Sequence, residues 1–248
     1  MPAPAEPIVQ IVPTAEAATP LLLGELRAAI ARRTRPVIGF ATGATFAPLF
    51  AALAAEFAAG RIGRTDFVAT HLDEYEGFPP ARAGGMVHEL VTRCPPFADM
   101  LAAGAFAPVP ADDRLLPAHE ERIARLGGVE LQFLGIGRNG HVAFNEPGTP
   151  FETGFHRTAL ATTTREDARP RFLPDEPPRH ALTAGIASIL AARRLVLCAF
   201  GKGKAAAVAA MLGARPATSC PASAVRLHGN ALVVLDRAAS ASIGQAAE

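Results

Sequence analysis

Residues 134–148 read Leu-Gly-Ile-Gly-Arg-Asn-Gly-His-Val-Ala-Phe-Asn-Glu-Pro-Gly, and the fold prediction starts from this stretch. An apolar run that is typical of a buried strand, Val129–Leu134, leads into it. Three closely spaced glycines follow, and glycine allows sharp turns and a close approach of the backbone to a ligand. In open α/β sheets, ligands bind at the carboxyl ends of the strands. We therefore expect a strand that ends in a ligand-binding loop.

The reactive side chains His141, Asn145 and Glu146 share the short turn after the glycines. A lone histidine is most often a structural residue, but an imidazole and a carboxylate in one turn favour an active-site loop. Residues 135–140 also fit the pattern G-x-G-x-x-G of dinucleotide-binding loops, which requires a helix after the third glycine. Pro147 prevents a long helix there, and no ribose-binding acid ends a strand roughly 20 residues later. Nucleotide binding is therefore the weaker hypothesis.

Apolar runs of strand length alternate with helical patterns along the chain. Strands are expected at residues 8–12, 36–41, 66–72, 129–134, 194–200 and 231–236, with weaker ones near 105–109 and 158–164. Helices are expected at residues 15–33, 46–59, 84–93, 117–126, 180–192, 205–212 and 220–227, and Pro95-Pro96 is expected to break the chain. With no shift in composition and no repeat, the pattern predicts an α/β fold. It has a single doubly wound, mostly parallel sheet with helices on both faces, in one domain over residues 1–248.

The composition limits the classes of function. Half of the 248 residues are hydrophobic, and the net charge of +1 provides no basic surface for nucleic acid or an acidic membrane. Three widely spaced cysteines without a C-x-x-C pair indicate reduced thiols in a cytoplasmic protein and no metal site. The N-terminus lacks the pattern of a signal peptide, and no apolar run reaches about 18 residues. We expect no nucleic-acid or membrane partner.

Two strand-to-helix turns fit a phosphate. Thr42-Gly43-Ala44-Thr45 follows one apolar strand, and Gly201-Lys202-Gly203-Lys204 follows another. Backbone N–H groups beside a helix N-terminus favour phosphate, and the Thr42 and Thr45 hydroxyls and the Lys204 ammonium would add donors. Every βα unit needs such a turn, so the pattern alone does not decide between a phosphate site and a plain connection.

Charged residues in two other places leave alternatives open. Asp73 and Glu74 directly follow a predicted strand, where a general base is expected, and neighbouring charge and burial can raise a carboxyl pKa towards neutrality. A solvated acidic loop is the other reading. Arg165, Arg169 and Arg171 form a basic cluster that would face either a phosphate or water.

Several segments together resemble the glucosamine-6-phosphate deaminase family, within the wider group that includes the 6-phosphogluconolactonases. The matching segments occur in family order over nearly the whole chain. They are residues 39–45 (Gly-Phe-Ala-Thr-Gly-Ala-Thr), 72–77 (Leu-Asp-Glu-Tyr-Glu-Gly), 134–149, 181–186, 201–204 and 227–228. The loop ending in Asn-Glu-Pro-Gly is the specific motif, because the lactonase loop resembles it only as far as the histidine.

The resemblance implies a modified Rossmann-like sheet without a metal or cofactor. It implies an aldose-ketose isomerase-deaminase that converts glucosamine 6-phosphate, or a related aminosugar phosphate, to fructose 6-phosphate and ammonia. Asp73 is then the base that shuttles a proton, and His141 protonates the ring oxygen. Glu146 orients or charges the histidine, and Asn139 occupies a position where members have Asp or Asn. The remaining implied residues bind substrate: Thr42, Gly43, Ala44, Thr45, Glu74, Gly137, Arg171 and Lys204. The partner is a small sugar phosphate, and the protein is a monomer or homo-oligomer.

This sequence departs from the family pattern at several positions. Ala44 stands where serine or glycine is usual, and Phe46 replaces a proline. The phosphate-binding arginine aligns with Pro170, so a neighbouring arginine, Arg171, is assigned its role by a one-residue shift. Two alternatives therefore stay open beside the deaminase. One is a sugar-lactone hydrolase that uses His141 as base, and the other is a non-catalytic sugar-phosphate sensor.

Overall fold

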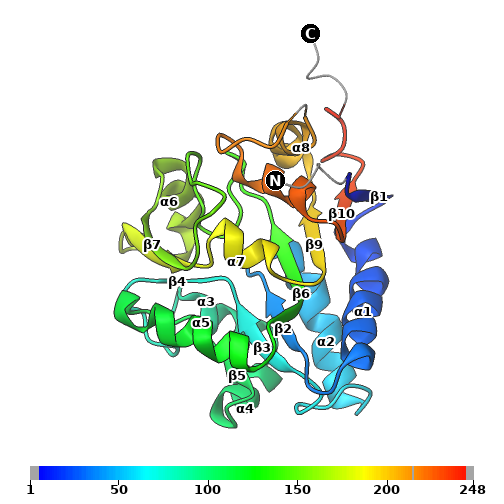
Figure 1. Ribbon diagram of the computed structural model, residues 1–248, viewed down its shortest axis with the longest axis vertical. Helices are drawn as coiled ribbons and strands as arrows, with labels where there is room; N and C mark the ends of the chain where they lie inside the picture. The colour runs from blue at the N-terminus through cyan, green and yellow to red at the C-terminus, as the bar shows by residue number, and fades with distance from the viewer. Residues whose placement is uncertain (1–5, 214, 244–248) are drawn as a thin grey trace.

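The computed structural model describes residues 6–213 and 215–243, and its centre is a seven-stranded parallel sheet (Figure 1). The strand order is β1-β10-β9-β6-β2-β3-β5. The strands are β1 (Ile8–Val12), β2 (Val37–Phe40), β3 (Val68–His71), β5 (Phe106–Ala107), β6 (Val129–Gly135), β9 (Leu195–Ala199) and β10 (Ala231–Asp236). The ends of the predicted domain, residues 1–5 and 244–248, lie outside the described residues.

The strand order reverses between β2 and β6. From β2 the chain proceeds outwards through β3 and β5, and it then returns to place β6 on the other side of β2. The loops after β2 and β6 therefore diverge at their carboxyl ends, which is the place where such sheets bind ligands. The predicted doubly wound, mostly parallel α/β fold is confirmed.

Helices cover both faces of the sheet. The α-helices are α1 (Ala15–Arg32), α2 (Ala47–Ala58), α3 (Met86–Arg93), α4 (Pro96–Ala102), α5 (Leu116–Arg125), α6 (Thr162–Ala168), α7 (Ile186–Leu190) and α8 (Ala205–Met211). Short 3-10 turns are η1 (Ala44–Phe46), η2 (Asp113–Leu115), η3 (Arg169–Arg171), η4 (Lys202–Lys204) and η5 (Pro221–Leu227). α1 packs on α2 on one side, while α5 and α7 lie on the other side (Figure 1).

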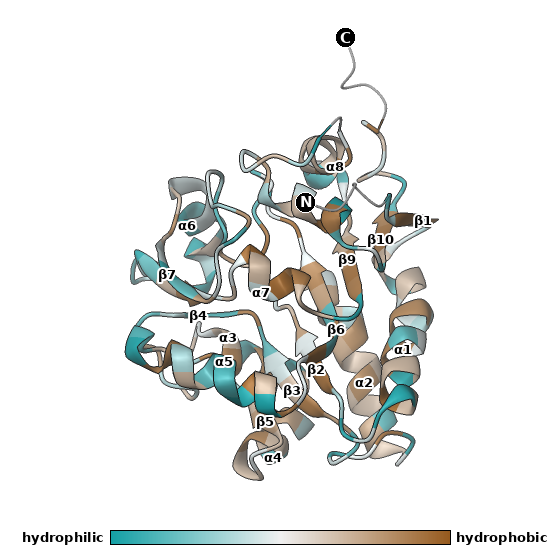
Figure 2. Ribbon diagram, in the orientation of Figure 1, coloured by the Kyte–Doolittle hydropathy of each residue, from teal (hydrophilic) through white to brown (hydrophobic). Residues whose placement is uncertain are grey.

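Aromatic rings fill the layer between the sheet and α2. Phe40 of β2 contacts the rings of Phe50, Phe67, Phe97 and Phe133, and all five side chains are buried. Figure 2 shows the central strands as mainly hydrophobic and the outward face of α5 as hydrophilic. The cluster joins β2 to β6 and so fixes the two strand ends from which the site loops begin.

A second, three-stranded antiparallel sheet was not predicted. It has the order β4-β8-β7, with β4 at Asp73–Tyr75, β8 at His180–Thr183 and β7 at His156–Ala159. Asp73 pairs with Thr183, so the chain after β3 continues as a strand, and the alternative of a solvated acidic loop is excluded. The small sheet holds Asp73 in a defined position at the edge of the main sheet.

Two local predictions were wrong, and one helix was missed. The predicted helix at residues 180–192 begins as β8, because pairing with β4 and β7 overrides the helix propensity of its alanines and leucines. Of the strand predicted at 158–164, residues 162–164 start α6. The predicted break at Pro95-Pro96 is confirmed, because α3 ends at Arg93, but the helix α4 that follows was not predicted. α4 begins at Pro96, since a proline in the first turn needs no hydrogen-bond acceptor for its nitrogen.

Candidate active site

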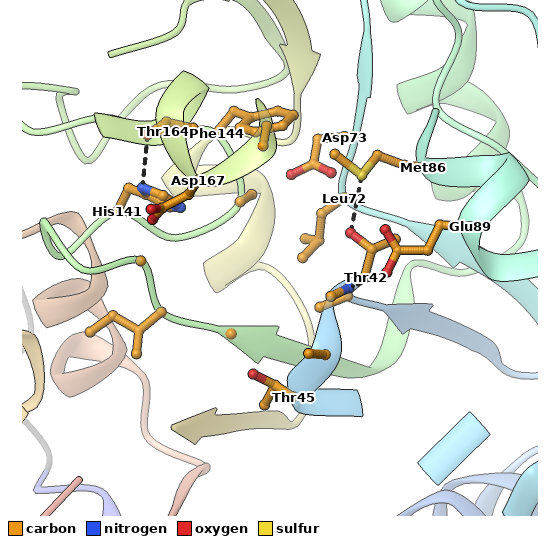
Figure 3. Close-up of a pocket in the computed structure, with 18 of the residues that line it drawn as sticks. Thr42, Thr45, Leu72, Asp73, Met86, Glu89, His141, Phe144, Thr164 and Asp167 are labelled. Atoms are coloured by element: carbon orange, nitrogen blue, oxygen red, sulfur yellow. Dashed lines mark hydrogen bonds between the residues drawn. The ribbon is translucent and has the colours of Figure 1, made fainter. Parts of the chain in front are cut away.

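The loops after β2, β3, β6 and β9 meet around a cavity of about 640 Å³ (Figure 3). Asp73 and His141 both line it, and Figure 3 shows them approaching the same space from opposite sides. Most of the predicted site residues lie on its wall: Thr42, Gly43, Ala44, Thr45, Asp73, Gly137, His141, Arg171 and Lys204. Residues that are distant in the sequence are thus brought to one side of the sheet.

Asp73 is the buried acid of the cavity. Asp73 is 8% exposed, and its carboxyl group has no hydrogen bond to any other described residue. Burial, and then the negative charge of Glu74, raises the pKa of the Asp73 carboxyl to about 8, although the Arg171 guanidinium opposes the shift. An unpaired carboxyl with a pKa close to neutrality can accept and return a proton.

Glu74 does not line the cavity, in contrast to the predicted substrate contact. Its carboxylate accepts the backbone N–H groups of Tyr75, Met86 and Val87 at 2.8, 3.0 and 3.0 Å. The N–H groups of Met86 and Val87 belong to the first turn of α3, which has no intrahelical acceptor for them. Glu74 therefore anchors α3 to β4, and alternation along β4 sends its side chain away from the face of Asp73.

His141 belongs to a chain of polar contacts. Its Nδ1 lies 3.8 Å from Glu146 Oε2 and 3.3 Å from Thr164 Oγ1. Asn139 Nδ2 donates to the same Glu146 oxygen at 2.9 Å, and Asn139 Oδ1 accepts the His141 N–H at 3.2 Å. The other oxygen of Glu146 accepts the Ala161 N–H at 3.1 Å. Asn139 and Glu146 therefore contact His141 but do not themselves line the cavity.

The environment of His141 favours the neutral imidazole. Burial lowers the pKa of His141, and the nearby Glu146 carboxylate acts in the opposite direction. The Nδ1 side faces Glu146 and Thr164, so the other ring nitrogen is the one available to a ligand. Through this nitrogen the ring can accept a proton or, in its other tautomer, donate one.

The turn after β2 and the loop after β9 carry the predicted phosphate donors. Gly43 has a φ of 97°, which glycine adopts without strain. Lys204 lies at the start of α8, and burial lowers the pKa of its ammonium group while Asp167 opposes the shift. Of the arginines that the sequence left open, Arg171 lines the cavity, whereas exposed Arg169 pairs with Glu176 at 3.0 Å.

Sequence reasoning missed several residues of this cavity. Glu89 of α3, Thr164 and Asp167 of α6, and Phe144 all line it. No motif marks α6, because its position over the cavity depends on the contact of Ala161 with Glu146 and on the second sheet. Glu89 and Arg93 are four residues apart, a spacing that predicts an ion pair on one helix face. This spacing gives no information about the cavity.

The described residues contain neither a group of His, Cys, Asp and Glu side chains suited to a metal ion nor a helix suited to crossing a membrane.

The family model for glucosamine-6-phosphate isomerases/6-phosphogluconolactonase matches residues 13–234. The chain belongs to this family. It is accordingly an enzyme of the glucosamine-6-phosphate isomerase/6-phosphogluconolactonase family, with the doubly wound fold that its sequence predicted.

Relatives within the family carry the deaminase name. The chain is 37% identical to a glucosamine-6-phosphate deaminase of Streptomyces avermitilis over 246 residues, which is 95% of this chain and 92% of the relative. It is 35% identical to one of Rhodopirellula baltica, with 96% and 97% of the two chains covered.

Solved structures agree with the assignment to this family. A monomeric glucosamine-6-phosphate deaminase superposes with a TM-score of 0.85 at 29% identity, covering 94% of this chain and 99% of that one. The 6-phosphogluconolactonase of Trypanosoma brucei superposes with a TM-score of 0.77 at 17% identity, covering 97% and 100%, which shows the shared fold.

Proposed function

We propose that this enzyme converts glucosamine 6-phosphate, or a closely related aminosugar phosphate, to a ketose phosphate and ammonia. The observation that carries the proposal is the placement of Asp73 and His141 in one cavity, where they face the same space. The raised pKa of Asp73 supports its role as the base that moves a proton between neighbouring carbons. The names of the relatives support the choice of substrate.

The first step is binding and ring opening. The Thr42–Thr45 turn, Arg171 and Lys204 bind the phosphate, which positions C1 and C2 of the sugar near Asp73. The free ring nitrogen of His141 delivers a proton to the ring oxygen, while the hydroxyl proton on C1 is lost and the C1 aldehyde forms. Glu146 stabilises the imidazole in its protonated form because its charge raises the pKa of His141.

The second step is isomerisation and loss of ammonia. Ionised Asp73 removes the proton from C2 while the C1 oxygen takes a proton from solvent, which gives an enolamine, and Asp73 then returns its proton to C1. The product is an imine at C2, and addition of water followed by loss of ammonia leaves the C2 ketone. This sequence conserves electrons within the substrate, so it needs no redox cofactor.

A lactone hydrolase is the second candidate. Burial lowers the pKa of His141, and a neutral imidazole suits a general base that activates water. In that reaction Asp73 has no proton to move. The two candidates therefore make different predictions for Asp73→Asn, which keeps the size of the side chain and removes its acid.

The test measures ammonia release from glucosamine 6-phosphate and hydrolysis of 6-phosphogluconolactone by the wild-type protein and by Asp73→Asn. The proposal predicts ammonia release by the wild type and a loss on the order of 10³-fold in the variant. Lactone hydrolysis that Asp73→Asn leaves unchanged, without ammonia release by either protein, would replace the deaminase with the hydrolase.

A further inference from the structure

A carboxylate of the protein itself occupies the turn that is proposed to bind phosphate. Glu89 projects from α3 to the cavity wall, where Figure 3 shows it beside Thr42. Its Oε1 accepts the Gly43 N–H at 2.8 Å. The Glu89 side chain is only 11% exposed, so this contact is a packed feature of the site and not a loose surface contact.

The same carboxylate pairs with two guanidinium groups. Arg171 donates through Nη1 to Glu89 Oε2 at 2.8 Å, and Arg93 donates through Nε to Oε1 at 3.0 Å. Arg171 also donates to the Tyr75 hydroxyl at 3.0 Å, which fixes the plane of its guanidinium. A turn N–H and arginine donors are the groups that proteins use to bind a phosphate, and here they converge on an internal anion.

We propose that Glu89 competes with the substrate phosphate for the Gly43 N–H and for Arg171. This inference rests on the sugar-phosphate substrate of the proposed function. A phosphate that binds at this turn displaces Glu89, because two anions on the same donors repel each other. An unphosphorylated sugar offers no anion in exchange and leaves the turn occupied by Glu89.

The opposite role for Glu89 is to orient Arg171 for the phosphate. In that case the carboxylate would remain in place when the phosphate binds, and its removal would weaken phosphate binding. Competition predicts that its removal strengthens phosphate binding. The sign of the change in affinity therefore separates the two roles.

The experiment is calorimetric titration of the full chain with inorganic phosphate, comparing the wild type with Glu89→Gln. We expect the dissociation constant to fall on the order of tenfold in the variant, because one repulsive charge is removed. Glu121→Gln is the matched control, since Glu121 is 71% exposed on α5 and carries the same charge next to an arginine. Its dissociation constant should equal that of the wild type. An unchanged or weaker affinity in Glu89→Gln overturns the proposal.

A second measurement uses the wild-type protein alone. Phosphate that replaces Glu89 should shift the amide resonance of Gly43 and the side-chain carboxyl resonance of Glu89 in the same titration. Phosphate binding that leaves both resonances unchanged contradicts the competition. Neither measurement requires turnover, so absence of ammonia release would reject the proposed reaction without deciding the role of Glu89.

Discussion

The imidazole of His141 lies directly against the Cα of Gly137. A Cβ added to Gly137 would lie 2.2 Å from the ring carbon Cε1, well inside contact distance. The backbones of the same two residues are joined by a hydrogen bond of 2.9 Å from the Gly137 N–H to the His141 carbonyl. The glycine therefore determines where the ring can lie.

Gly137→Ala should displace the ring and reduce kcat on the order of 10²-fold, because a shift of about 1 Å in a catalytic group has that cost. Circular dichroism should show an intact fold. Gly24→Ala is the control, since nothing lies within 4 Å of its added Cβ, and it should keep wild-type activity. Wild-type kcat in Gly137→Ala would show that the position of His141 does not matter for the reaction.

The pH dependence of kcat/KM should report the ionisation of Asp73 in the free enzyme. The pKa of about 8 means that the base is mostly protonated at pH 7. Because the proposed mechanism needs Asp73 ionised and His141 protonated, we expect a bell-shaped pH profile of kcat/KM for glucosamine 6-phosphate, with activity lost at both low and high pH. A profile that is flat between pH 6 and pH 9 would exclude Asp73 as the titrating base.

The stability of the protein should also depend on Asp73. The folded protein keeps the proton up to about pH 8, whereas the unfolded chain releases it near the ordinary pKa of 3.8. The wild-type free energy of unfolding therefore falls between these two values as the pH rises, by linkage. Asp73→Asn does not titrate, so its stability relative to the wild type should increase from pH 4 to pH 8 in denaturant titrations. A pH-independent difference between the two proteins would contradict this expectation.

Glu146→Gln should lower the pKa of His141 further. The Glu146 carboxylate raises the pKa of the imidazole against the effect of burial, and the amide cannot do so. The measurement is an NMR titration of the His141 ring, with the remote Glu121→Gln variant as control. An unaltered titration in Glu146→Gln would remove the proposed role of Glu146 in stabilising the protonated ring.

Glu74→Ala should reduce the free energy of unfolding by about 2–4 kcal/mol, because three buried N–H groups lose their acceptor. Glu74→Gln retains one acceptor oxygen and should cost less. Chemical denaturation measures both values. A loss below about 0.5 kcal/mol in Glu74→Ala would show that Glu74 does not anchor α3.

Most of the main sheet was predictable because its strands are continuous apolar runs between glycine turns, as Val129–Leu134 illustrates. The second sheet was not predictable, because His180–Thr183 is a strand only through its pairing with β4 and β7. Asp73 and His141 were predicted from their places after strands. Glu89 was not, because only the folded chain brings it to Gly43.

The most direct test of the central claim is turnover of glucosamine 6-phosphate in deuterated water, with the products followed by NMR. Wild-type protein should release ammonia and form fructose 6-phosphate, and the deuterium content at C1 measures how often the proton on Asp73 exchanges with solvent before its return. Asp73→Asn, shown to be folded, should form neither product. Equal ammonia release by the two proteins would contradict the role of Asp73 in the shared cavity.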